Sequence, residues 1–198
     1  MKPREVGVIS DTHGLVRPEA LAALRGVERI VHAGDVGSPD VLARLREIAP
    51  VSAVRGNNDR GPWADALPLS DVVEIGDVSL YVLHDLHELD LEPHAAGFAA
   101  VISGHSHQPR VDTKHGVLYL NPGSAGPRRF TLPICLARLT IDGTRLSARL
   151  VTLSGLSSRE KVTSHGDRGG ARAGDFSREG GYAPLRLPRP GARTRFKT

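Results

Sequence analysis

Cysteines and long apolar runs are scarce in this sequence, and each absence excludes a class of protein. Cys135 is the only cysteine among 198 residues, which excludes an intramolecular disulfide framework and a cysteine-based zinc site. No apolar run approaches the roughly 20 residues that a membrane-spanning helix needs. Residues 1–8 contain no apolar stretch of signal-peptide length. We therefore expect a reducing, cytoplasmic setting and no membrane partner.

The net positive charge of the chain comes from its C-terminal segment. The formal net charge is +4, whereas residues 154–198 alone contain ten Lys or Arg and four Asp or Glu, which leaves the first 153 residues at about −2. The same segment is rich in Gly, Arg and Pro and poor in apolar residues, so it cannot bury enough surface to offset the entropy of ordering. We expect one domain over residues 1–153 and a disordered basic tail over 154–198. Nucleic acid is an unlikely partner and would bind only through this tail.

Apolar runs and amphipathic stretches alternate in the first third of the chain. The amphipathic stretches at 18–24 and 39–48 repeat apolar residues at helical spacing, and Ser38 suits the N-cap of the second. The predicted strands lie before, between and after them, at 6–9, 29–31 and 51–54. Strands that alternate with helices indicate a parallel sheet with helical crossovers.

The remainder of the domain is rich in strands. Three pairs of predicted strands flank a Gly-containing turn, which is the signature of a β-hairpin. The pairs are 71–75 with 78–83, 110–114 with 117–120, and 134–141 with 146–153. A short helical stretch is predicted around 93–98, followed by a strand at 100–103. Two sheets packed face to face with helices outside accommodate this pattern.

Polar clusters directly follow five of the predicted strands. These clusters are residues 10–14, 32–35, 55–59, 84–85 and 103–107. In open α/β sheets the carboxyl ends of the strands form the binding crevice. We therefore expect five loops to converge on one site.

Seven side chains in these clusters form a coherent set of metal ligands. They comprise two carboxylates, one amide and four imidazoles: Asp11, His13, Asp35, Asn57, His84, His105 and His107. Such a set suits Mn²⁺ first, with Fe²⁺, Zn²⁺, Co²⁺ or Ni²⁺ as alternatives, and suits Ca²⁺ poorly. Seven ligands are too many for one tetrahedral ion but fit two divalent ions that share a carboxylate.

Each cluster taken alone has a simpler interpretation. Asp11 after a strand is commonly a turn residue or a helix N-cap, and residues 56–59 on their own make a good turn. His32 and His94 are interpreted as surface residues or as neighbours of the ligands. The five clusters together, in fixed order at strand ends, predict the dinuclear site.

The order of these motifs resembles the calcineurin-like metallophosphoesterase superfamily. The matching motifs are Asp11-x-His13, Gly34-Asp35, Gly56-Asn57-x-Asp59, His84 and Gly104-His105-x-His107. Residues 9–14, 54–57 and 121–124 are more similar to the small bacterial and archaeal phosphodiesterase branch. The resemblance spans about residues 6–153. It implies a four-layer αββα sandwich, in which helices flank two mixed β-sheets.

The resemblance also implies roles for individual residues. The first ion would be held by Asp11, His13, Asp35 and His107, and the second by Asp35, Asn57, His84 and His105. Asp35 would bridge the two ions, and a hydroxide between them would attack phosphorus in line. The implied substrate is a small phosphoester, with a phosphodiester first. The alternative is a non-catalytic scaffold of the same fold, and a homo-oligomer is possible in either case.

Two positions depart from the usual pattern of the superfamily. Many members have a His directly after the metal-binding Asn to protonate the leaving group, whereas this chain has Asn58, followed by Asp59. Asn cannot act as a general acid, so we expect a preference for activated leaving groups. Asp85 stands where Gly is usual and would orient a neighbouring His. His87 is a candidate replacement acid, and Asp35, Asn57, Asn58 and Asp59 are the catalytic candidates.

Overall fold

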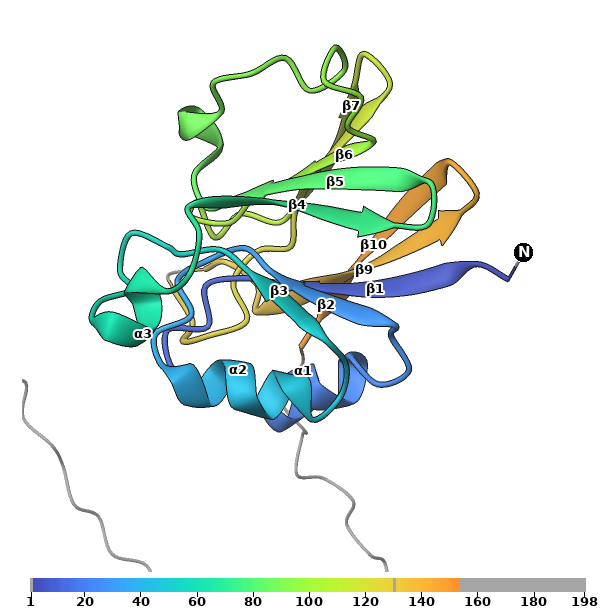
Figure 1. Cartoon of the computed structure of the whole chain (residues 1–198). Coiled ribbons are helices and arrows are strands. Elements are labelled where there is room, and N and C mark those ends of the chain that lie inside the picture. Colours follow the sequence, from blue (N-terminus) through green and yellow to red (C-terminus); the bar gives the residue numbers. More distant parts are fainter. Residues whose placement is uncertain (1, 130, 154–198) are drawn as a thin grey trace, which may run out of the picture. The chain divides into compact units, whose positions relative to one another are not determined.

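Two five-stranded mixed sheets stack face to face in the computed structural model, which describes residues 2–129 and 131–153 (Figure 1). The first sheet has the order β10-β9-β1-β2-β3 and contains β1 (Arg4–Ile9), β2 (Arg29–His32), β3 (Val51–Ala53), β9 (Cys135–Asp142) and β10 (Arg145–Thr152). The second has the order β4-β5-β6-β8-β7 and contains β4 (Ser70–Ile75), β5 (Val78–Leu83), β6 (Ala100–Ile102), β7 (Arg110–Lys114) and β8 (Val117–Asn121). The predicted sandwich of two mixed sheets is confirmed, whereas the predicted tail lies outside the described residues.

Parallel pairing of β1, β2 and β3 follows from the two helical crossovers between them. Helix α1 (Pro18–Ala23) joins β1 to β2, and α2 (Pro39–Arg46) joins β2 to β3. Each helix begins at a proline, whose missing N–H costs nothing in the first turn. Ser38 occupies the predicted N-cap of α2, but its side chain makes no capping hydrogen bond. A third helix, α3 (Pro62–Asp65), follows β3.

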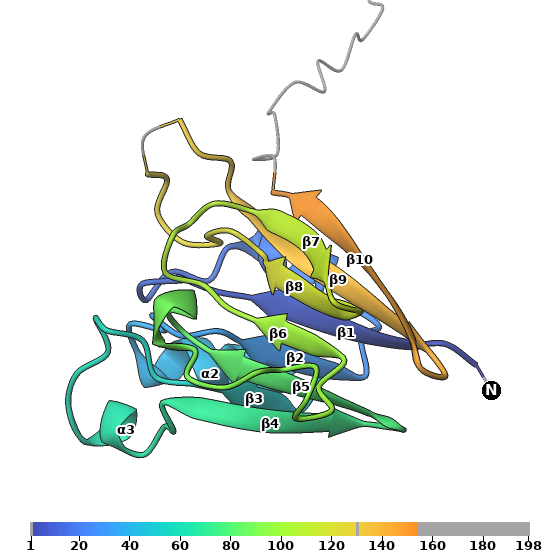
Figure 2. The same cartoon turned by 90° about the horizontal axis from the view of Figure 1, so that it is seen from above.

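Hairpins form the two edges of the second sheet. Strands β4 and β5 pair antiparallel at one edge, and β7 and β8 at the other, as the turn signals predicted. In the middle, β5, β6 and β8 run parallel, so that β5 and β6 both end on the same side (Figure 2).

Alternation along the strands divides the apolar core into two main clusters. Between the sheets, Val8 and Val31 of the first pack in one cluster with Leu80 and Ile102 of the second. On the outer face of the first sheet, residues such as Ile30 pack against α1 and α2. A fully buried side chain of this size contributes about 1.5–3 kcal/mol. The loops that carry the site are therefore anchored in well-packed strands.

The segment between β5 and β6 covers the outer face of the second sheet with a 3₁₀ turn, η1 (Leu86–Glu88), and loops (Figure 1). Phe98 stacks against Tyr81, with ring centroids 5.1 Å apart. The predicted helix around 93–98 is wrong, because residues 93–97 form turns. Gly97, at φ +79°, ends the helical conformation after one turn. The described residues include no helix long and apolar enough to cross a membrane.

Candidate metal centre

Five loops meet at one end of the two sheets, and they carry the seven predicted ligands. The loop after β1 supplies two of them and the loops after β2 and β3 one each, while the second sheet supplies the rest after β5 and β6. In the same order the ligands are Asp11 and His13, Asp35, Asn57, His84, and His105 and His107. The contacts described next show that the structure brings all seven together.

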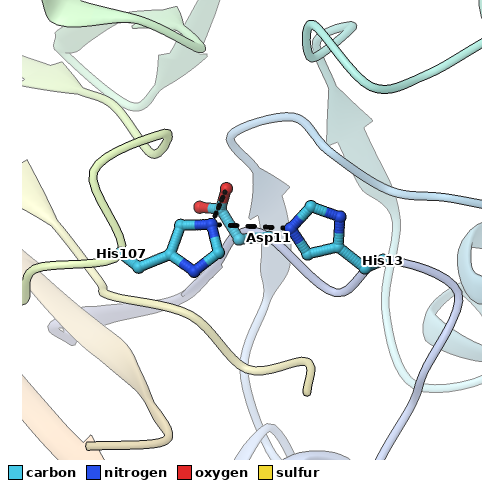
Figure 3. Close-up of side chains that lie close together, drawn as sticks. All are labelled: Asp11, His13 and His107. Atoms are coloured by element: carbon cyan, nitrogen blue, oxygen red, sulfur yellow. Dashed lines mark hydrogen bonds and ion pairs between the residues drawn. The ribbon is translucent and has the colours of Figure 1, made fainter. Parts of the chain in front are cut away.

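Asp11, His13 and His107 form the first group (Figure 3). Nε2 of His107 lies 3.2 Å from Oδ1 of Asp11 and 3.5 Å from Nε2 of His13. One ligand atom from each residue lies within 4.8 Å of the other two. Three potential donors thus face a common point from loops nearly a hundred residues apart in sequence.

The second group is centred on Asp35 and His84. Nε2 of His84 lies 3.5 Å from Oδ2 of Asp35 and 3.0 Å from Oδ1 of Asn57. Oδ1 of Asn57 also lies 3.0 Å from Nδ1 of His105. Oδ2 of Asp35 is 3.8 Å from Nε2 of His13 in the first group. Asp35 therefore lies between the two groups, where a bridging carboxylate belongs.

Asp11 provides the test of whether these residues fit a cation. The residue is fully buried, and neither carboxylate oxygen has a hydrogen-bond partner among the described residues. A buried carboxylate is costly unless a charge compensates it. Asp11, Asp35 and His84 also place ligand atoms within 4.8 Å of one another. The donor set and the buried carboxylate, whose oxygens accept no hydrogen bond from the described residues, thus fit divalent metal ions.

The backbone of this site is strained at the ligands themselves. Six described residues other than Gly have positive φ angles, and five of them are predicted ligands: Asp11 at +53°, His13 at +46°, Asp35 at +52°, His105 at +63° and His107 at +57°. The sixth is His115, in the turn between β7 and β8. Asp and His tolerate this conformation better than most residues but still less well than Gly. Strained residues cluster at functional sites, which supports assigning one here.

Two glycines let neighbouring loops approach the ligands closely. A Cβ atom on Gly56 would collide with the backbone nitrogen and a carboxylate oxygen of Asp35. One on Gly104 would collide with the Ser10 hydroxyl and press on the Asp11 carboxylate. The close approach of these loops to Asp35 and Asp11 therefore requires glycine at both positions.

Burial and hydrogen bonding shift the pKa values of Asp35 and His84 in opposite directions. Burial raises the pKa of Asp35, but hydrogen bonds from His84 and Asn58 more than offset it and hold that pKa well below its usual range. Burial lowers the pKa of His84, but its contacts with Asp35 and with the Ala33 carbonyl raise it overall. Asp35 is therefore ionised at neutral pH.

His32 lies behind the ligands and not at the surface. It is fully buried, and its Nε2 is 2.9 Å from the hydroxyl of Thr12, between Asp11 and His13. Burial lowers its pKa to about 4, so the ring is neutral at physiological pH. Of the two sequence interpretations, that of a neighbour of the ligands is the one that this position supports.

The sequence from residue 5 to residue 144 matches the calcineurin-like phosphoesterase superfamily domain. The chain belongs to this superfamily. The superfamily implies divalent metals, and the groups described above are candidate ligands for them.

Three known proteins are similar to this superfamily member in sequence or in fold. A probable metallophosphoesterase of Methanothermobacter thermautotrophicus is 39% identical over 158 residues, which cover 74% of this chain and 91% of that protein. The structure of an archaeal phosphodiesterase superposes with a TM-score of 0.62 at 23% identity, covering 74% of this chain and 99% of the other. Vacuolar protein sorting 29 of Cryptosporidium parvum gives 0.61 at 19%, covering 77% and 98%. The two structural likenesses show the fold.

Asn58 and Asp59 follow the predicted ligand Asn57 in this member of the superfamily but are turned toward other groups. Asn58 donates to both carboxylate oxygens of Asp35. The carboxylate of Asp59 is buried and accepts hydrogen bonds from the backbone amides of Val36, Gly37 and Gly56. Both side chains therefore hold the loops after β2 and β3 together.

Asp85 and His87 lie on the other side of the site. Oδ2 of Asp85 is 3.5 Å from Nε2 of His105, and Oδ1 is 2.9 Å from Nδ1 of the exposed His87. Asp85 therefore contacts a predicted ligand, as the sequence analysis expected of a carboxylate at this position.

The sequence analysis gave no role to two residues that support the ligand loops. Asn121 donates to the Gly104 carbonyl at 2.6 Å, and the Ser124 hydroxyl donates to the Asp11 carbonyl at 3.0 Å. The only signal for them was the Asn-Pro-Gly-Ser motif at 121–124, which contributed to the family resemblance.

Proposed function

We propose that this chain is a hydrolase of phosphodiester bonds that works with two divalent metal ions. The observation that carries the proposal is the position of Asp35 between the Asp11 group and the His84 group, beside a buried Asp11 carboxylate that accepts no hydrogen bond from the described residues. Ions bound there would activate a water molecule and neutralise the phosphoryl oxygens as charge develops. Mn²⁺ is the ion that the mixed nitrogen and oxygen ligands favour first.

The ligands divide between two ions as their contacts do. We assign the first ion to Asp11, His13, Asp35 and His107, and the second to Asp35, Asn57, His84 and His105. Nδ1 of His84 lies 2.7 Å from the Ala33 carbonyl oxygen, which can only accept a hydrogen bond. The proton of a neutral His84 ring thus resides on Nδ1, and Nε2 presents a lone pair toward the site.

The remaining candidates act by positioning. We assign to Asn58 the orientation of the Asp35 carboxylate, and to Asp59 the shape of the loop that carries Asn57. We assign to Asp85 the orientation of His105. None of these contacts supplies a proton to the leaving group, so the preference for activated leaving groups stays part of the proposal.

The alternative is a protein-binding scaffold, because vacuolar protein sorting 29 shares the fold. All seven ligand positions of this chain carry metal-binding side chains, and their contacts join them into one site. A chain that served only as a scaffold would have no need to keep them. We therefore favour the hydrolase.

Metal removal and reconstitution test the proposal. Purified protein would be stripped with a chelator, reloaded with Mn²⁺, and assayed on bis(p-nitrophenyl) phosphate and p-nitrophenyl phosphate. We expect chelation to abolish hydrolysis, Mn²⁺ to restore it best, and the diester to be cleaved faster. His107→Gln should lose activity, whereas His94→Gln, which alters an exposed His outside the site, should not.

Two outcomes would contradict the proposal in different ways. Hydrolysis that survives exhaustive chelation would refute the metal mechanism. Metal binding without hydrolysis of any ester would favour the scaffold.

A further inference from the structure

A cavity of about 330 Å³ opens directly beside the candidate metal centre. His105, one of the proposed ligands, forms part of its wall. Asp85 and His87 line it from the segment around η1, and Arg110 and Lys114 line it from β7. The cavity therefore extends the site from the strand ends over β7 and β8.

Hydrogen bonds fix the walls of this cavity. Oδ1 of Asp85 accepts from the backbone amide of His87 at 3.0 Å, and its two oxygens contact the rings of His87 and His105. Opposite them, the side-chain amide of Asn121 donates to the Gly104 carbonyl and, at 3.1 Å, to the Ser106 hydroxyl. The walls next to His105 are therefore tied to the strands below.

Most of the side chains that line the cavity carry a polar group, and their formal charges balance, while apolar atoms form the larger part of the lining surface. Asp85 and Asp112 oppose Arg110 and Lys114, and most of the other lining side chains can form hydrogen bonds. Arg110 is already paired with Asp112, at 2.8 Å. A lining of this kind favours an uncharged group with many hydroxyls.

Tyr119 adds a flat surface to the lining. The Lys114 ammonium lies 5.5 Å from the centre of the Tyr119 ring, and the ring packs with Val101 and Val117 on the outer side of the sheet. Sugar rings carry both C–H and O–H groups, which suit an aromatic face beside hydrogen-bonding side chains. The volume lies at the lower end of the range for small-molecule sites, about 300–1,000 Å³. The volume is sufficient for one sugar-sized group.

We propose that this cavity binds one of the two alcohol parts of a phosphodiester substrate, namely the part that stays on the phosphate when the leaving group departs. We propose further that this part is a polyhydroxylated alcohol of the sugar, nucleoside or glycerol kind. The proposal rests on the proposed function, since the phosphorus must lie at the metal centre for an ester group to enter a cavity that begins at His105. It adds the class of alcohol that the enzyme selects. Arg110 and Lys114 are assigned as hydrogen-bond donors to the hydroxyls.

Mixed p-nitrophenyl phosphodiesters measure selectivity for the alcohol in the cavity while the bond that is cleaved stays the same. Each substrate releases the same p-nitrophenolate, while the second ester group is methyl, glycerol, glucose or the 5′-oxygen of thymidine. We expect one of the three polyhydroxylated esters to exceed the methyl ester at least about tenfold in kcat/KM, as one or two hydrogen bonds to charged side chains would give. The order of the three identifies the source of the alcohol.

The double variant Arg110→Met, Lys114→Met tests the assigned residues, because Met keeps most of the side-chain length and removes the donors. The ratio of kcat/KM between the preferred ester and the methyl ester should fall to near one. Arg145→Met, an exposed arginine on β10 of the other sheet, is the matched control and should keep the ratio. Calorimetry with the corresponding phosphomonoesters should show the same loss in binding.

The outcomes distinguish this proposal from the one on which it rests. Hydrolysis of all the esters at similar kcat/KM, or a preference that persists in the double variant, would overturn the cavity assignment and leave the hydrolase standing. Failure of the metal-loaded wild type to cleave any ester would refute the hydrolase, and the cavity assignment with it.

Discussion

Both carboxylate oxygens of Asp35 accept hydrogen bonds from Asn58, Oδ1 from the backbone amide at 2.8 Å and Oδ2 from the side-chain amide at 2.6 Å. The family resemblance implied a general acid at the position that Asn58 occupies. In this chain the residue instead acts on the carboxylate that lies between the two ligand groups. Asn58 thus fixes the orientation of the Asp35 carboxylate. It cannot supply a proton to the leaving group.

The hydrolysis rate should depend strongly on the pKa of the leaving group, because no general acid stands at position 58. General acid catalysis contributes about 10²–10⁴-fold, mainly for poor leaving groups. We expect wild type to cleave aryl phosphodiesters much faster than alkyl ones, and Asn58→His to narrow the gap by raising the alkyl rate. The measurement is a series of esters whose leaving groups span several pKa units. Asn58→Ala is the control, because it also removes the side-chain hydrogen bond to Asp35.

A wild-type rate that hardly depends on the leaving group would contradict this prediction. Another residue would then donate the proton, and His87 would be the first to test as His87→Gln. The design carries one risk, because an imidazole at position 58 can bind a metal ion itself. Elemental analysis of Asn58→His detects that outcome.

Asp35→Asn should remove more metal than any other single ligand change. Asp35 contacts members of both ligand groups, so its neutralisation weakens both ions. We expect about two ions per chain in reconstituted wild type and close to none in Asp35→Asn. His107→Gln, which alters the first group only, should retain about one ion. Equal metal content in Asp35→Asn and His107→Gln would argue against a bridging carboxylate.

Asp59→Ala should destabilise the protein. It removes the acceptor of three backbone amides, those of Val36 at 3.2 Å and of Gly37 and Gly56 at 2.8 Å. Because buried donors are left unpaired, we expect a loss of about 2–3 kcal/mol in the free energy of unfolding, measured by urea denaturation. Asp65→Ala is the control, since Asp65 forms only an exposed ion pair with Arg55 and should cost less than about 1 kcal/mol. Similar midpoints for the two variants would disprove the assigned role.

Cys135 should be unreactive until the protein unfolds. Burial raises the pKa of its thiol to about 11, and Sγ donates to the Pro122 carbonyl. Iodoacetamide at pH 8 should therefore alkylate native protein very slowly and urea-unfolded protein rapidly. Because the pKa of Cys135 is higher in the folded protein than in the unfolded chain, its protonated thiol contributes fully to the free energy of unfolding below about pH 8.5. This contribution is lost as the pH rises from there toward the folded pKa. Cys135→Ala should show a smaller loss of stability between pH 9 and 11.

Truncation after Leu153 should leave the domain intact. Leu153 is buried in the cluster beneath α1 and α2, so the cut must follow it. All seven ligands lie between residues 11 and 107, and we expect the truncated chain to melt near the wild-type temperature and to hydrolyse small esters at a similar rate. Any salt-sensitive binding of nucleic acid should disappear with the tail. A large fall in melting temperature would contradict the predicted domain boundary.

The strands and the convergence of the candidate ligands could be predicted from the sequence, because both depend on local patterns. Helical spacing between apolar runs implied parallel strands, and parallel strands place Asp11, Asp35 and Asn57 at one edge of the sheet. The direction of Asp59 could not be predicted, because it depends on which amides of another loop lack partners. The turns at 93–97 were missed for a similar reason: one helical turn and a short helix share the same local sequence signals.

Five proposed ligands have a left-handed backbone conformation, which lowers the stability of the fold at the positions that the proposed chemistry needs. They are Asp11, His13, Asp35, His105 and His107. Each such residue carries a penalty of about 1–2 kcal/mol that a glycine would escape. Glycine would relieve this backbone strain at each position, and the proposed metal site requires the side chains that are there. A lineage released from that demand would be expected to drift toward a sturdier and inert protein.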